Sequence, residues 1–159
     1  MDRRAETAAA YFSANAQNWQ KLRSLHLDEN KVESRIKAMI GREPVETLVD
    51  LGTGTGRMLE LFAGQARRLV GIDLSREMLT YARSNLDQLN ANHAQVRQAS
   101  LYALPLADSS ADVVILHQVL HFLDEPEAAL REARRILKPS GKLLVVDFAP
   151  HELEDLREN

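Results

Sequence analysis

The chain has 159 residues, a formal net charge of -3 and no cysteine. This length fits one domain with a sizeable core, and nothing in the charge balance indicates a nucleic-acid surface. The lack of cysteine excludes disulfides, thiolate zinc sites and cysteine nucleophiles. No apolar run approaches the ~20 residues of a membrane helix and no signal-peptide pattern opens the chain, so we expect a cytoplasmic protein without a membrane partner.

Two helices are predicted at the amino-terminal end. The first is alanine-rich and covers residues 2–19, with Tyr11 and Trp19 at helical spacing; such aromatic residues either pack into a core or contact a ligand. The second runs from Asp28, a plausible N-cap, to Ile40. Its predicted apolar face consists of Val32, Ile36, Met39 and Ile40.

The most informative stretch covers residues 45–73. A short apolar run over 45–51 predicts a buried parallel strand, and a glycine-rich loop over 52–56 follows it directly. A helical pattern and a second strand come next, and that strand ends at Asp73. A loop of this kind lets a ligand approach bare backbone at a helix N-terminus, while an acid at the next strand's tip suits a ribose.

The glycine spacing narrows the class of ligand. A dinucleotide fingerprint would place its third glycine at Arg57, and a P-loop would place a lysine after the last glycine; neither is present. Asp50 instead stands two residues before three alternating glycines. The run D-L-G-T-G-T-G at residues 50–56 resembles the D/E-x-G-x-G-x-G signature of class I S-adenosylmethionine-dependent methyltransferases.

Later segments extend this resemblance. The run Q-A-S-L-Y-A-L-P at 98–105 is similar to the family's G-D-A-x-x-L-P, although Ala99 and Ser100 replace the usual glycine and aspartate. The run L-K-P-S-G-K-L-L-V-V at 137–146 is similar to L-K-P-G-G-x-L-l-i. The chain also resembles the methyltransferase half of proteins fused to an ArsR-type winged-helix repressor.

The remaining elements complete an alternating pattern. The first is a helix over 76–90, capped by Ser75, whose buried stripe should be Met78, Ala82, Leu86 and Leu89. An edge strand over 94–99 and a central strand over 111–116 should follow. A helix that opens at 125–127 and a strand over 142–148 should come last. The resemblance implies an α/β class: a Rossmann-like, doubly wound, mostly parallel sheet with five visible strands ordered 3-2-1-4-5. It further implies a helical lid in residues 1–43 and a cofactor domain in residues 44–159 that lacks the last two family strands.

The resemblance also implies the ligand and its contacts. The cofactor is expected to be S-adenosyl-L-methionine, with S-adenosyl-L-homocysteine as product. Backbone of the loop should approach the methionyl part, Asp73 should take both ribose hydroxyls, and Ser100 should lie at the adenine edge. The full set of expected contacts is Tyr11, Trp19, Asp50, Gly52, Thr53, Gly54, Gly56, Asp73, Leu74, Met78, Ser100, Leu101 and His117.

His117 follows the central strand and is the candidate general base for an oxygen, nitrogen or carbon acceptor. His121 lies four residues further on. Two histidines at this spacing can bind a metal, but no third ligand is evident, so no metal is expected. Packing, or a hydrogen bond to backbone, is the alternative for both side chains.

The acceptor itself is expected to be an unidentified small molecule, with no nucleic acid bound through this domain. An NAD-dependent oxidoreductase shares the fold, but the glycine spacing disfavours it. A non-catalytic cofactor-binding module of a transcription-regulator fusion remains the main alternative. The open edge of the fifth strand predicts a homodimer through strand pairing, or a tail from Pro150 onward that covers this edge.

Overall fold

The computed structural model describes residues 29–147 of the chain. The predicted first helix, with Tyr11 and Trp19, lies outside the described residues, as do Asp28 and everything from Phe148 onward. Within residues 29–147, no helix is both long and apolar enough to span a bilayer.

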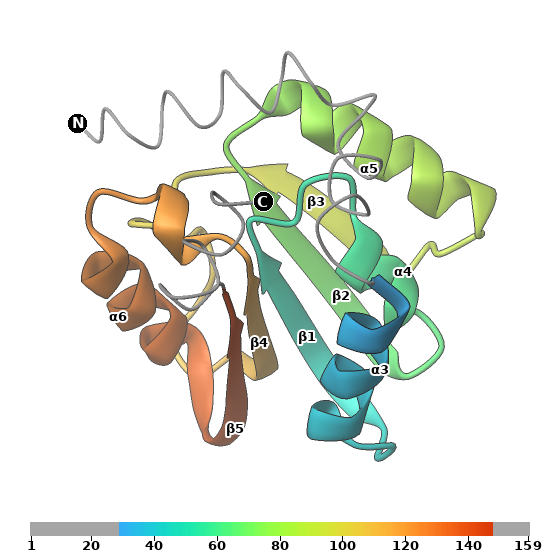
Figure 1. Cartoon of the computed structure of the whole chain (residues 1–159), viewed down its shortest axis with the longest axis horizontal. Coiled ribbons are helices and arrows are strands. Elements are labelled where there is room, and N and C mark those ends of the chain that lie inside the picture. Colours follow the sequence, from blue (N-terminus) through green and yellow to red (C-terminus); the bar gives the residue numbers. More distant parts are fainter. Residues whose placement is uncertain (1–28, 148–159) are drawn as a thin grey trace, which may run out of the picture.

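Five strands form one sheet in the order β3-β2-β1-β4-β5 (Figure 1). Every neighbouring pair is parallel. The strands are β1 (Val45–Leu51), β2 (Ala66–Asp73), β3 (Ala94–Gln98), β4 (Ala111–His117) and β5 (Leu137–Val146). This arrangement confirms the expected α/β class and strand order, and it confirms β3 as an edge strand.

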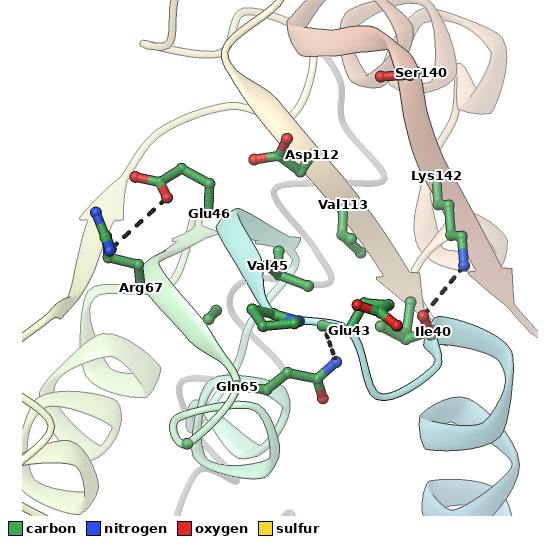
Figure 2. Close-up of a pocket in the computed structure, with 13 residues that line it drawn as sticks. Ile40, Glu43, Val45, Glu46, Gln65, Arg67, Asp112, Val113, Ser140 and Lys142 are labelled. Atoms are coloured by element: carbon green, nitrogen blue, oxygen red, sulfur yellow. Dashed lines mark hydrogen bonds and ion pairs between the residues drawn. The ribbon is translucent and has the colours of Figure 1, made fainter.

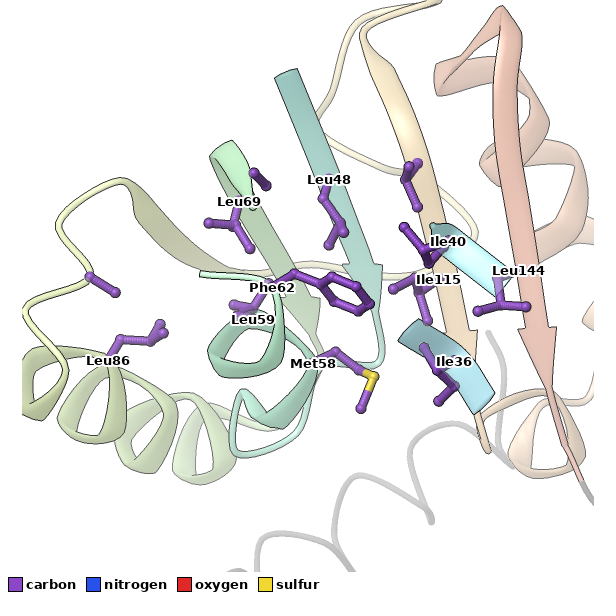
Figure 3. Close-up of a cluster of buried hydrophobic side chains, with 13 residues drawn as sticks. Ile36, Ile40, Leu48, Met58, Leu59, Phe62, Leu69, Leu86, Ile115 and Leu144 are labelled. Atoms are coloured by element: carbon purple, nitrogen blue, oxygen red, sulfur yellow. The ribbon is translucent and has the colours of Figure 1, made fainter. Parts of the chain in front are cut away.

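Helices cover both faces of this sheet. They are α3 (Glu29–Ile40), α4 (Arg57–Leu61), α5 (Arg76–Gln88), the short 3-10 helix η2 (Leu120–Phe122) and α6 (Pro126–Ile136). Side chains from α3, α4 and α5 join one face of the strands in a first buried cluster, drawn in Figure 3. On the opposite face, side chains of α6 join the strands in a second cluster. The central strands are buried on both sides, as parallel strands usually are.

The second face is covered partly by a loop. Between β3 and β4, residues 99–110 form turns without a helix. Their apolar side chains fill the space over the strands, because Leu104 is buried in the second cluster and Leu101 and Leu106 pack against it.

Two predicted helix faces need correction. Met39 is 55% exposed, and Glu33 is buried in the α3 stripe instead. Glu33 tolerates burial because it forms an ion pair with Arg57. Leu89 is also exposed, because α5 ends at Gln88 and the chain turns away at Asn90, where φ is +55°.

The fifth strand begins earlier than predicted. Pairing with β4 jumps from Ala111–Leu137 to Val113–Lys142, so residues 138–141, which precede the predicted strand, form an irregularity within β5. From Lys142 onward β5 carries apolar residues on both faces, but only Leu144 is buried. The outer pair, Leu143 and Val145, is 39% and 41% exposed.

Candidate functional site

The strand order reverses between β1 and β4. The chain continues from β1 to β2 on one side of this boundary, while β4 continues to β5 on the other (Figure 1). In open α/β sheets, ligands bind beyond the carboxyl ends of the strands at such a switch point. We expected the strands that end near Asp50 and Leu116 to flank this boundary, and the structure confirms it, because β1 and β4 pair in register there.

Three glycines shape the loop after β1. Gly52, Gly54 and Gly56 have φ values of +76°, +56° and +86°, which other residues adopt only with strain. A Cβ on Gly52 would lie 2.5 Å from Cγ2 of Val119, and one on Gly56 would lie 3.3 Å from Cβ of Ala82. The loop therefore needs glycine both for its backbone conformation and for its close contacts with α5 and with the turn after β4.

Hydrogen bonds fix this loop to the end of β2. The N–H groups of Gly52 and Thr53 both donate to the Ile72 carbonyl, at 2.7 and 3.0 Å. The Gly54 N–H donates to Oδ2 of Asp73 at 2.8 Å. The two parts of the predicted ligand site, the loop and the strand-tip acid, are thus joined directly.

Asp73 is a buried carboxylate held by backbone donors. Its Oδ1 accepts from the Ser75 N–H at 2.9 Å, while Oδ2 accepts from Gly54. Burial raises the pKa of Asp73 above its ordinary value, and the N–H groups of Ser75, Gly54 and Leu74 oppose that shift. Because each carboxylate oxygen has two acceptor sites, the carboxylate can still accept ribose hydroxyls.

The other polar residues of this region are also buried. Asp50 lies inside β1, opposite Gly71 on one side and Ile115 on the other. The Thr53 side chain packs toward β2, since a Cβ on Gly71 would lie 2.8 Å from its Oγ1. Within residues 29–147 that Oγ1 has no hydrogen-bond partner.

Three more of the expected contact residues, Leu74, Ser100 and Met78, lie after β2, after β3 and on α5. The Ala99 N–H donates to the Asp73 carbonyl at 3.1 Å, which places the neighbouring Ser100 beside the tip of β2. Ser100 Oγ accepts from the Tyr102 N–H at 3.1 Å and so shapes the turn over its own position. Leu74 is half-buried, whereas Met78 is fully buried on α5.

Ser75 caps α5 as predicted, because its Oγ accepts from the Met78 N–H at 3.2 Å. A contact that the sequence did not reveal adds to this corner. The Gln98 side chain donates to the Leu74 carbonyl at 3.1 Å and ties β3 to the start of α5.

His117 ends β4 and is buried beside Val146 of β5. The chain then turns at Gln118, where φ is +59°, and brings Val119 against Gly52. His117, predicted from the sequence as the base, therefore lies at the expected edge of the sheet, at the carboxyl end of β4.

Sequence reasoning missed a histidine–aspartate pair at the same edge. His121 Nδ1 is hydrogen-bonded to Oδ1 of Asp147, the residue that follows β5, and the His121 N–H donates to Oδ2 at 3.3 Å. The two side chains are 27% and 17% exposed. The adjacency of β4 and β5 could have suggested this pair, since their carboxyl ends must meet.

A second missed pair lies behind the glycine loop. Arg57 donates from Nε and Nη2 to the two carboxylate oxygens of Glu33, each at 2.7 Å. This bidentate bond raises the pKa of Arg57 and holds α3 against the first residue of α4. Arg57 thus has a structural partner at the position where a dinucleotide-binding loop would carry glycine.

A cavity of about 620 Å³ lies at the opposite, amino-terminal edge of the sheet, as Figure 2 shows. Lys142 Nζ there donates to the Ile40 carbonyl at 3.2 Å, and Arg67 pairs with Glu46 at 3.7 Å. None of the predicted site residues lines this cavity.

Comparison with known proteins gives a consistent result. Residues 49–145 match the family model described as "Methyltransferase domain". An arsenite methyltransferase of Halobacterium salinarum is 32% identical over 114 residues, which are 70% of this chain and 29% of that protein. The ubiquinone/menaquinone biosynthesis C-methyltransferase UbiE of Shewanella baltica is 34% identical over 122 residues, 74% of this chain and 49% of that protein. The chain therefore spans less than half the length of these two relatives.

Among solved structures, a SAM-dependent methyltransferase from Aquifex aeolicus superposes with a TM-score of 0.68 at 25% identity. The match covers 81% of this chain and 72% of that one.

Proposed function

We propose that this chain, which belongs to the family of methyltransferase domains, transfers a methyl group from its cofactor to a small-molecule acceptor. The bond from the Gly54 N–H to Asp73 is the observation that carries the proposal. It joins a bare-backbone loop to an acid at a strand tip, at the switch point of a parallel sheet. That combination suits a ligand with a ribose and a charged tail.

S-adenosyl-L-methionine is the cofactor of this domain, and the residues present fit it. The glycine loop and the buried carboxylates Asp50 and Asp73 provide close backbone approach and two negative charges for a ligand with an ammonium group and ribose hydroxyls. When bound, S-adenosyl-L-methionine supplies an electrophilic methyl group and leaves as S-adenosyl-L-homocysteine.

Each part of the site has one role in the proposal. The backbone of Gly52, Gly54 and Gly56 admits the methionyl part, and Asp50 orients its ammonium group. Asp73 accepts both ribose hydroxyls in charge-assisted hydrogen bonds. The adenine is bordered by Leu74, Met78, Ser100 and Leu101. Thr53 supports the loop, and His117 faces the methyl group. Tyr11 and Trp19 contribute contacts from a lid in residues 1–43.

Positioning supplies most of the rate in such a reaction, because the displacement is in-line and the donor carries its own leaving group. The relatives named above differ in what they methylate, one being an arsenite methyltransferase and the other a C-methyltransferase of quinone biosynthesis. We therefore assign a small molecule as acceptor, and the net charge of -3 favours this over nucleic acid.

Calorimetry with S-adenosyl-L-methionine, S-adenosyl-L-homocysteine and NADH tests the binding part of the proposal. The first two should bind and NADH should not; the reverse result would contradict it. Turnover is tested with methyl-labelled cofactor and a panel that contains arsenite and a benzoquinol. Tight binding without transfer to any acceptor would favour the non-catalytic, regulatory module instead.

A further inference from the structure

The carboxyl ends of β4 and β5 bring a histidine and an aspartate into contact. Asp147 uses both of its oxygens on one residue, since Oδ1 bonds to Nδ1 of His121 and Oδ2 accepts the His121 N–H at 3.3 Å. The neighbouring Phe122 ring lies 4.1 Å away between centroids, at an interplanar angle of 40°. The imidazole is therefore held in position from two sides.

This contact decides which nitrogen of the imidazole carries a proton. An ionised carboxylate accepts hydrogen bonds and cannot donate them, so Nδ1 must be the donor. In the neutral ring, Nε2 then has the lone pair and can take up a proton. Asp147 also stabilises the imidazolium that results, as the aspartate of a catalytic triad does for its histidine.

The pair lies beside the cofactor loop. Val119, two residues before His121, contacts Gly52 so closely that a Cβ on Gly52 would approach it to 2.5 Å. The turn after β4 therefore meets the start of the loop at Val119, and His121 follows this contact by two residues. His117 is a less suitable base, because it is buried at the end of β4, whereas the His121 side chain is 27% exposed.

We infer that His121 is the base that removes a proton from the methyl acceptor, and that Asp147 is the positioning residue that sets its tautomer. This inference rests on the proposed methyl transfer. The proton of the attacking atom passes to Nε2 of His121. The electron pair left on that atom forms the bond to the methyl carbon, and the pair of the broken carbon–sulfur bond remains on sulfur.

The kinetic test compares two acceptors in the full chain. With a benzoquinol, which must lose a proton, His121→Asn should lower kcat by ~100-fold or more without changing the KM for S-adenosyl-L-methionine. With arsenite, which attacks through a lone pair on arsenic, the same variant should change kcat little. Added imidazole should restore part of the benzoquinol activity of His121→Ala.

A structural role predicts a different pattern. If His121 only holds the turn after β4, both acceptors should lose activity equally and imidazole should restore nothing; this result would overturn the inference. His93→Asn is the matched control, because His93 lies on the loop before β3 and contacts the Ala63 carbonyl far from the pair. It should leave both activities unchanged.

A second measurement requires no turnover. Long-range proton–nitrogen NMR spectra of the cofactor-bound protein, with ¹⁵N-labelled histidine, should show the His121 proton on Nδ1, and Asp147→Asn should abolish that preference. A proton fixed on Nε2 would overturn the inference even if neither acceptor is methylated. Failure of cofactor binding in calorimetry would instead count against the proposed function.

Discussion

The sheet divides between β1 and β4 into two halves that differ in construction. The cofactor half consists of β1, β2 and β3 with the loop over 52–56. The other half, which we call the acceptor half because the proposed base His121 lies in it, consists of β4 and β5 with residues 118–122 and Asp147. In the cofactor half the critical contacts are made by backbone N–H groups to one buried carboxylate. In the acceptor half a side chain, the His121 imidazole, also bonds to the carboxylate that accepts the His121 N–H, and apolar residues of β5 remain exposed.

A backbone-built site needs only a few glycines and acids, so many acceptor specificities can use the same cofactor half. A site built from side chains changes with single substitutions. The following predictions test whether the two halves are as distinct as they look.

Gly52→Val should have the largest effect, because Gly52 is where the loop of the cofactor half contacts the turn after β4. The variant combines positive-φ strain with a clash against Val119, and should destabilise the fold by about 2–4 kcal/mol and abolish cofactor binding. Thermal unfolding and calorimetry measure both. Adding Val119→Ala should recover part of the stability; no recovery would mean that the clash is unimportant.

Asp73→Ala should weaken S-adenosyl-L-methionine binding by roughly 2 kcal/mol, about 30-fold, because a charged acceptor of hydroxyl groups is lost. The loop also loses the acceptor of its Gly54 N–H. Glu46→Ala, which removes an exposed ion pair at the far edge, is the control. Equal affinities for wild type and Asp73→Ala would remove Asp73 from the site.

The raised pKa of Asp73 predicts opposite pH dependences for binding and stability. The folded chain keeps this proton to a higher pH than the unfolded chain, so the stabilising contribution is present below the unfolded pKa and is lost as pH rises through the folded pKa. Cofactor affinity should change the other way and fall on acidification, because ribose hydroxyls bond best to the ionised form. At each pH, the free energy of unfolding and the cofactor affinity are measured for wild type and for Asp73→Asn, and the difference in each quantity isolates the contribution of Asp73.

Ser100→Asp should tighten cofactor binding slightly, by up to about 1 kcal/mol, by providing a charged acceptor for the adenine amino group. Aspartate can also retain the bond to the Tyr102 N–H that shapes this turn. The half-buried position limits the desolvation cost. Weaker binding in calorimetry would show that adenine lies differently in this cofactor half.

The smallest expected effect concerns the outer edge of the acceptor half. We expect weak self-association through β5, because its edge pairs with no other strand among the described residues and Leu143 and Val145 are exposed. Light scattering over a concentration series should show a dimer that Val145→Lys disrupts. A strict monomer at millimolar concentration would contradict self-association through β5.

Local features and long-range contacts differ in how well the sequence predicts them. The glycine loop, Asp73 and the Ser75 cap could be predicted because each depends on local backbone geometry within one motif. The pairs Glu33–Arg57 and His121–Asp147 were missed, because each joins elements distant in sequence. Only the adjacency of β4 and β5 could have suggested the second pair. Met39 was wrongly assigned to the core for the same reason, since an ion pair with another helix allowed Glu33 to be buried there.

The bond between Gly54 and Asp73 has a thermodynamic consequence for ligand capture. A loop that is ordered only by its ligand loses conformational entropy at the moment of association, which weakens the affinity. Here the loop is already ordered by β2 and α5, so that entropy is lost during folding. Cofactor association should therefore be fast, with a heat-capacity change set by the apolar surface of the ligand rather than by loop ordering.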